Sequence, residues 1–155
     1  FFVDIWQFNR AFSEVTIENK DFEALIKQYD RPGAFIYCDP PYFDAEGFYA
    51  IAFPKADHVR LRDTLKKAQG YVMVSYNNSP EIIELYQDFY IFHTTRPNSM
   101  SHKEGDVYEE LIITNYDPRP YLQAKNHQLN LFSLISMFSE GEYKLIHEPS
   151  KPLKA

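Results

Sequence analysis

The sequence predicts an α/β domain built on a mostly parallel sheet with helices on both of its faces. Two observations lead to this class. Short apolar runs alternate with helical patterns as far as residue 95, which is the order of strand–helix–strand units. The apolar runs are also continuous, which is typical of strands covered on both faces. Sheets of this kind bind ligands at the carboxyl ends of their strands.

The first part of the chain predicts a strand, a helix and a second strand. Residues 14–19 (EVTIEN) alternate between polar and apolar side chains, as a strand does. Asp21 is then placed to cap a helix that residues 30–33 (DRPG) end. Residues 34–38 (AFIYC) form the next, buried strand. The helix is indicated by an apolar stripe at i, i+3, i+4 and i+7, formed by Phe22, Leu25, Ile26 and Tyr29.

The middle of the chain predicts two helices with a buried strand between them. Asp57 caps the first helix and Gly70 ends it. Residues 71–76 (YVMVSY) form the strand, and the Ser79 hydroxyl caps the second helix, with Pro80 in its first turn. The inward side chains are Val59, Leu61, Leu65 and Ala68 in the first helix and Ile82, Leu85 and Tyr86 in the second.

Two further strands, residues 89–95 and 108–116, are separated by a polar stretch too long for a tight turn. The character of the sequence changes after Tyr116, where a proline-bearing linker begins. We therefore expect one domain over residues 1–116, followed by a linker and a C-terminal tail over residues 117–155.

The composition suits one ordinary domain of 155 residues and excludes several classes. No apolar run is long enough for a membrane span, and the opening residues lack the features of a signal peptide. A single cysteine, Cys38, suits a reducing cytosol, so we expect a cytoplasmic protein. The net charge of −6 disfavours non-specific coating of nucleic acid. No Cys/His cluster has metal-ligand spacing, so no metal is expected.

The candidate site is the stretch FIYCDPPYFDAEGFY, where an apolar strand ends in Asp39, Pro40, Pro41 and Tyr42. The Asp39 carboxylate is an acceptor, and the prolines lack N–H groups, so their carbonyls can point outward. The Tyr42 ring offers a flat surface beside them. Together these groups can hold a planar molecule with an exocyclic amine, such as adenine. The alternative, that Asp-Pro-Pro-Tyr is simply a turn, stays open at this point.

The stretch DPPY after an apolar strand resembles the catalytic motif of the Dam-type (D12 class) adenine-N6 DNA methyltransferases. Residues 15–42, 71–86 and 108–116 resemble further segments of that family in the same order. The resemblance implies a Rossmann-like sheet, mostly parallel, with an antiparallel last strand. It also implies S-adenosylmethionine as the cofactor and double-stranded DNA as the substrate, with the target adenine flipped out.

The resemblance also implies roles for particular residues. Asp39 and the Pro40 carbonyl would accept hydrogen bonds from the N6 amine of adenine, and Tyr42 would stack on its ring. Asp21 and Phe22 would hold the adenine of the cofactor, although Phe22 also lies on the helical stripe. Phosphate contacts are expected in the polar stretch, which can equally be a solvated loop, from Arg96, Asn98, Ser99 and Lys103.

The sequence departs from the family in lacking a Gly-rich turn for the methionine part of the cofactor. Its five glycines, at positions 33, 47, 70, 105 and 141, are far apart. We therefore expect the C-terminal part of a methyltransferase, inactive alone and incomplete as a sheet. A missing N-terminal segment or a partner chain would carry the Gly-rich motif. A fragment, a truncated gene product and half of a split enzyme stay open. So do a non-catalytic binding remnant, an RNA or protein-amide substrate, and methylation of cytosine N4.

A second motif, QLNLF, spans Gln128, Leu129, Asn130, Leu131 and Phe132. It resembles the short peptide by which bacterial DNA-processing proteins bind the replication sliding clamp. Leu131 and Phe132 would fill an apolar pocket, with Gln128 hydrogen-bonding at its rim. The alternative is an amphipathic helix that packs on the sheet through Leu131, Leu134, Ile135 and Phe138.

Overall fold

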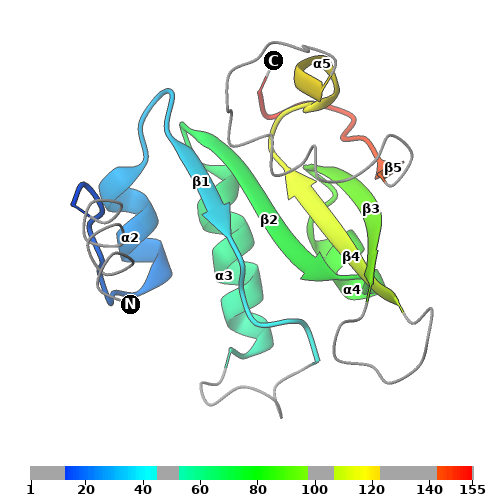
Figure 1. Ribbon diagram of the computed structural model, residues 1–155, viewed down its shortest axis with the longest axis horizontal. Helices are drawn as coiled ribbons and strands as arrows, with labels where there is room; N and C mark the ends of the chain where they lie inside the picture. The colour runs from blue at the N-terminus through cyan, green and yellow to red at the C-terminus, as the bar shows by residue number, and fades with distance from the viewer. Residues whose placement is uncertain (1–12, 45–52, 98–106, 123–142, 155) are drawn as a thin grey trace, which may run out of the picture.

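The computed structural model describes residues 13–44, 53–97, 107–122 and 143–154 (Figure 1). Strands and short helices alternate along the first half, as the sequence predicts. The elements in chain order are α2 (Phe22–Tyr29), β1 (Phe35–Cys38), α3 (Lys55–Lys66), β2 (Tyr71–Asn77), α4 (Pro80–Leu85), β3 (Tyr90–Pro97), β4 (Val107–Thr114), α5 (Arg119–Leu122) and β5 (Lys144–His147).

The strands form one mixed sheet in the order β1-β2-β4-β3-β5. Only β1 and β2 pair in parallel among the described strands; β4 is antiparallel to both β2 and β3, and β5 is antiparallel to β3. The prediction of a mostly parallel sheet was therefore wrong. β1, β2 and β3 do share one direction. β4 lies between β2 and β3 and runs the opposite way, so both of its pairings are antiparallel. The antiparallel closing strand agrees with the resemblance.

The core lies between the sheet and the two helices α3 and α4, which cover one of its faces (Figure 1). Alternate residues of β2 point to this face, and Val72, Val74 and Tyr76 have no exposed surface. Each fully buried side chain of this size contributes about 1.5–3 kcal/mol to folding. They pack with Leu61, Leu65, Ile82, Tyr86, Leu111 and Ile113.

Several local predictions were wrong for identifiable reasons. Residues 14–19 form no strand, and Val15 and Ile17 are 51% and 84% exposed, because alternation alone provides no pairing partner. α3 begins at Lys55 with Pro54 at the N-cap, so Asp57 lies in the first turn instead. Val59 is 40% exposed rather than inward.

Two further predictions, the Ser79 cap and the burial of β1 on both faces, were also wrong. The Ser79 hydroxyl makes no capping bond and instead donates to Glu81 Oε2 at 2.6 Å. β1 is not covered on both faces: Tyr37 is 55% exposed, whereas Ile36 and Cys38 pack against the core.

The start of the β1–β2 pair is fixed by Asp30 and Gly70. Asp30 accepts hydrogen bonds from the backbone N–H groups of Gln69 and Gly70, each at 2.8 Å. A Cβ at position 70 would lie 2.7 Å from the Ala34 carbonyl oxygen, so this close approach requires glycine. The Tyr71 N–H then donates to the same carbonyl at 2.7 Å, which sets the register of the parallel ladder.

Residues beyond position 116 contribute to the same body. β5 pairs with β3, and Leu153 packs against the core. This strand was not predicted from the sequence, because four residues carry too little pattern. Within the described parts of the chain, none of the helices has the length and apolar character that crossing a membrane requires.

Candidate active site

The DPPY motif begins where β1 ends, beside the carboxyl end of β2 and the start of β4 (Figure 1). β1 and β2 are parallel and in register up to Cys38 opposite Val74, so the residues that follow them meet at one edge of the sheet. This is the edge at which the sequence predicts a site. Three side chains from β2 and β4 hold the motif there: Ser75, Asn77 and Glu110.

The Asp39 side chain is exposed and is held through one of its two oxygens. Ser75 Oγ lies 2.7 Å from Asp39 Oδ1 and donates to it. The Tyr37 hydroxyl in turn lies 3.0 Å from Ser75 Oγ. No partner in the described part of the chain is recorded for Oδ2 of Asp39 or for the carbonyl of Pro40. These are the two acceptors that the sequence predicts for an exocyclic amine.

The two residues after the prolines are held more firmly. The Tyr42 hydroxyl donates to Glu110 Oε1 at 2.5 Å, which fixes one end of the ring. The Phe43 N–H donates to Asn77 Oδ1 at 2.9 Å, and Asn77 Nδ2 donates back to the Phe43 carbonyl at 3.2 Å. The Phe43 ring is buried in the core. The loop is therefore anchored at Tyr42 and Phe43, with Asp39 and Pro40 presented at its open side.

A row of aromatic contacts leads from this loop to Phe22. His58 packs edge-on against Phe43 at 5.3 Å and against Phe53 at 4.7 Å between ring centroids. Phe53 lies 5.7 Å from Phe22, and the His58 Nδ1 atom is 2.8 Å from the Tyr76 hydroxyl. No role was predicted for His58, which is 3% exposed and lies in the core.

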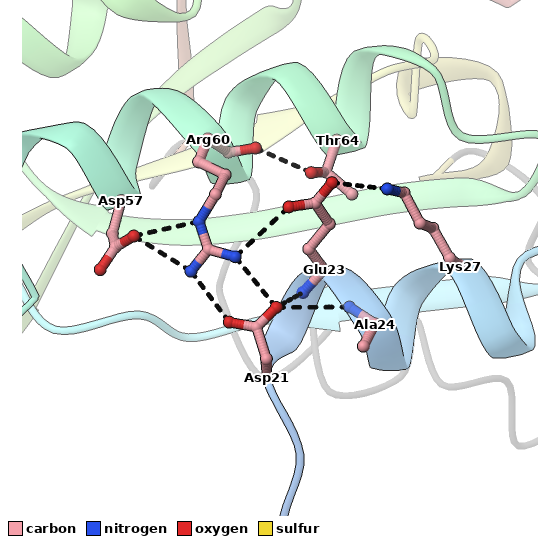
Figure 2. A network of polar contacts seen from close by, with 7 residues as sticks. All are labelled: Asp21, Glu23, Ala24, Lys27, Asp57, Arg60 and Thr64. Atoms are coloured by element: carbon pink, nitrogen blue, oxygen red, sulfur yellow. Dashed lines mark hydrogen bonds and ion pairs between the residues drawn. The ribbon is translucent and has the colours of Figure 1, made fainter.

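Asp21, one of the two predicted cofactor residues, lies beside Arg60 (Figure 2). Phe22, the other, packs against the same guanidinium. Asp21 Oδ1 caps α2 by accepting from the Glu23 N–H at 3.0 Å and the Ala24 N–H at 3.4 Å. Arg60 of α3 donates to both oxygens of Asp21 at 2.9 Å and lies 4.0 Å above the Phe22 ring.

Arg60 also contacts Asp57 and Glu23, so three carboxylates surround one guanidinium. Its hydrogen bond holds the pKa of Asp21 below the usual value, against a smaller opposing effect of desolvation. The pKa of Glu23 is also lowered, first by its hydrogen bond with Lys27 and then by Arg60. The cluster ties α2 to α3, and it places Asp21 and Phe22 side by side on that junction.

A separate cleft of about 430 Å³ lies between α2 and α3, lined by residues that include Glu23, Ile26, Val59 and Arg60. No residue of the DPPY motif lines it. Its walls mix acidic, basic and apolar side chains without a dominant chemistry. We therefore place the candidate site at the DPPY loop, where the polar groups converge, and not in this cleft.

The remaining predicted residues are less defined. Arg96 lies in β3 opposite Tyr108 of β4. Asn98, Ser99 and Lys103 lie outside the described residues, as does the QLNLF segment with Gln128, Leu129, Leu131 and Phe132.

Cys38 packs against the core, and burial raises the pKa of its thiol to about 12, which agrees with a structural role. Across the described residues, no three His, Cys, Asp or Glu side chains are grouped to hold a metal ion.

Comparison with known proteins identifies the family. Residues 4–100 match the D12 class N6 adenine-specific DNA methyltransferase family, and the chain belongs to it. The match includes both the Asp21–Phe22 pair and the DPPY motif. The resemblance inferred from the sequence is thereby confirmed.

Two relatives are Type II methyltransferases by name. The Type II methyltransferase M1.LlaDCHI of Lactococcus lactis subsp. cremoris is 35% identical over 115 residues, which are 67% of this chain and 40% of the relative. The Type II methyltransferase M.CviBI of Paramecium bursaria Chlorella virus NC1A is 29% identical over 118 residues, which are 71% of this chain and 45% of the relative. The chain thus spans less than half the length of either relative.

Proposed function

We propose that this chain carries the target-amine half of an adenine-N6 DNA methyltransferase with S-adenosylmethionine as methyl donor. Family membership supports the reaction class. The observation that carries the proposal is the Asp39 carboxylate, which Ser75 anchors through Oδ1 at 2.7 Å. Its Oδ2 atom and the carbonyl of Pro40, the next residue, have no partner among the described residues. Two acceptors at one point suit the two N–H bonds of an exocyclic amine.

The residues of this site would act by orientation and electrostatics. An adenine amine that donates to Asp39 Oδ2 and to the Pro40 carbonyl directs its nitrogen lone pair out of ring conjugation, toward the methyl donor. Preorganised partners of this kind are effective because they do not reorganise during the reaction. S-adenosylmethionine, when bound, supplies a methyl group on a positively charged sulfur. As the nitrogen lone pair forms the N–C bond, the C–S bond of the donor would break with its electron pair left on sulfur, and the nitrogen would then lose one proton.

Tyr42 would hold the flipped base. Flipping costs a few kcal/mol, and stacking on an aromatic ring returns about 1–3 kcal/mol. The bond from its hydroxyl to Glu110 already fixes the ring in the free chain, so little ordering remains for the moment of binding. In this proposal the phosphates of the DNA are contacted by Arg96, Asn98, Ser99 and Lys103.

The described residues fit only the adenine end of the cofactor. Phe22 offers a ring, and Asp21 offers carboxylate lone pairs not used by Arg60 and the α2 cap. Gly33, with φ of +83°, makes a turn, and Gly70 permits the approach to Ala34, so neither cradles a ligand. We therefore place the methionine-binding Gly-rich turn in polypeptide outside these 155 residues, in the same protein or in a partner chain.

The test joins this chain to the part of the Lactococcus lactis relative that it does not cover. The hybrid is incubated with labelled S-adenosylmethionine and unmethylated duplex DNA, and the DNA is digested to nucleosides. We expect N6-methyldeoxyadenosine. N4-methyldeoxycytidine would correct the target base. A hybrid that unfolds cooperatively, and is thus folded, but transfers nothing would favour a non-catalytic binding remnant instead.

A calorimetric measurement on the 155-residue chain alone tests the division of the cofactor site between this chain and other polypeptide. We expect weak binding of S-adenosylmethionine or none, because Asp21, Phe22 and Asp39 would contact only part of it. Micromolar affinity would contradict this division and show that the chain completes the cofactor site by itself or as a dimer.

A further inference from the structure

The Asp39 carboxylate has one recorded side-chain partner in the described chain, the Ser75 hydroxyl. The arrangement follows from the ladder. Cys38 and Val74 are paired in the parallel register, so Asp39 and Ser75 come next on neighbouring strands. On β2, Val74 and Tyr76 are fully buried in the core, and Ser75 faces the opposite side of the sheet together with Tyr37 of β1.

The direction of both hydrogen bonds can be assigned from the chemistry of the groups. An ionised carboxylate only accepts, so the single hydroxyl proton of Ser75 is given to Asp39. Ser75 Oγ then has only lone pairs left, so the Tyr37 hydroxyl donates to it across 3.0 Å. The two hydrogen bonds therefore point in one direction: Tyr37 donates to Ser75, and Ser75 donates to Asp39. Successive bonds of one direction strengthen each other, and the bond to a charged acceptor is the stronger of the two.

Burial of Ser75 gives this series of hydrogen bonds a defined geometry. Ser75 is 6% exposed and sits on a central strand, flanked by β1 and β4, so its hydroxyl has few alternative partners. Asp39, by contrast, is exposed at the end of an edge strand and has a side chain that would otherwise rotate. A rigid donor beside a mobile carboxylate is the arrangement in which one hydrogen bond selects a rotamer.

We infer that Ser75, with Tyr37 behind it, is a positioning residue that fixes the Asp39 carboxylate with Oδ2 directed at the target amine. The inference rests on the proposed function for the identity of that amine. Neither the family nor the names of the relatives assign a role to Ser75 or Tyr37.

The test uses a matched pair of variants, Ser75→Thr and Ser75→Val. Both add a methyl group to a buried strand position, and they differ only in the hydroxyl. NMR three-bond couplings to the Asp39 carboxyl carbon report its χ1 rotamer in the 155-residue chain. We expect one rotamer in the original chain and in Ser75→Thr, and rotamer averaging in Ser75→Val. A single rotamer in Ser75→Val overturns the inference.

The second measurement is methyl transfer by the hybrid enzyme carrying the same substitutions. We expect Ser75→Val to lower kcat by about tenfold to a hundredfold at saturating DNA while the KM for DNA stays unchanged, because loss of orientation acts on the reacting geometry. Ser75→Thr restores kcat, and Tyr37→Phe, which keeps the Ser75 donor, has a smaller effect. Equal kcat values for Thr and Val overturn the inference.

The two measurements separate the inference from the function on which it rests. If the original hybrid transfers no methyl group, the proposed function fails, and the rotamer of Asp39 still decides whether Ser75 fixes it. If the hybrid is active and the Thr and Val variants do not differ, the function stands and the role of Ser75 is refuted.

Discussion

The Asn77 side chain forms hydrogen bonds with both the backbone N–H and the backbone carbonyl of Phe43. Its Oδ1 accepts from the Phe43 N–H at 2.9 Å, and its Nδ2 donates to the Phe43 carbonyl at 3.2 Å. A side-chain amide is suited to this because it combines an acceptor and a donor in one plane. Asn77 ends β2, so the contact ties the loop after β1 directly to the neighbouring strand.

We therefore predict that Asn77→Ala loosens the loop while the sheet remains folded. Two hydrogen bonds of about 0.5–1.5 kcal/mol each are lost. Amide hydrogen exchange at Phe43 should become roughly 10- to 100-fold faster, with strand amides such as Val74 unchanged. Asn77→Asp keeps the acceptor and should protect the Phe43 amide better than alanine does. Equal exchange rates of the Phe43 amide in all three proteins would contradict the proposed role of these two hydrogen bonds.

The second prediction concerns Asp39→Ala in the hybrid enzyme. Removal of one preorganised partner of the reacting group typically costs about 10²–10³ in rate, so methyl transfer should fall by at least this factor. DNA affinity should stay close to that of the parent, because Asp39 is assigned to the amine and not to the phosphates. Single-turnover kinetics and a DNA-binding titration measure the two quantities.

A matched control is Asp88→Ala, which removes a half-exposed carboxylate that pairs with Lys66. Surface pairs of this kind contribute little, so both activity and stability should be nearly unchanged. Parent-like turnover by Asp39→Ala would refute the catalytic assignment.

The third prediction concerns acid stability and Arg60. Arg60 lowers the pKa of Asp21, and with Lys27 it lowers the pKa of Glu23. A lowered folded-state pKa contributes stability above the unfolded-state pKa, and this stability is lost as the pH falls through the folded-state value. The ordinary values are 3.8 for Asp21 and 4.5 for Glu23, so the loss begins near those pH values and continues below them.

Arg60→Gln should therefore lower stability near neutral pH and flatten its decrease on the acid side. Urea unfolding midpoints between neutral and acid pH measure this. Arg31→Gln is the control, since it removes the same charge from a side chain whose recorded contact is the Tyr29 carbonyl. If the two variants lose stability with the same pH profile, the Arg60 cluster does not couple α2 to α3 electrostatically.

The fourth prediction tests the QLNLF segment. We propose that it binds a bacterial sliding clamp, because Leu131 and Phe132 are anchors of the kind that dominate small interfaces. A peptide of residues 124–138 should bind the clamp in a fluorescence titration, and replacing Leu131 and Phe132 with alanine should abolish binding. In the whole chain, the same double change should leave the unfolding midpoint unaltered. Loss of the fold together with no peptide affinity would refute the proposal.

The sequence predicted the position of the site better than the architecture around it. The DPPY loop follows β1 as expected, because an apolar run that stops at an acid and two prolines has few other structures. The Asp21 cap of α2 was also predicted, since capping is a local interaction. The strand order was not, because periodicity encodes the faces of a strand and not its neighbours. The false strand at residues 14–19 has the same origin.

The side chains that hold the loop were missed for a related reason. Ser75 lies within the run 71–76, which was interpreted only as a buried strand, and Asn77 directly follows that run. Glu110 lies about 70 residues from Tyr42 in sequence. A signal was present: Ser75 is a hydroxyl residue inside the apolar run YVMVSY. A polar residue in such a run needs a hydrogen-bond partner, and the acid at the end of the adjacent parallel strand was the available one.

The insertion of β4 between β2 and β3 also bears on biosynthesis. β3 is synthesised before either of its neighbours, β4 and β5. At 5–20 residues per second, synthesis from the end of β3 to the end of β4 takes roughly one to three seconds. During this interval the edges of β2 and β3 are open to pairing with other chains. A nascent chain stalled in this interval should therefore depend on chaperones more than one released after Thr114.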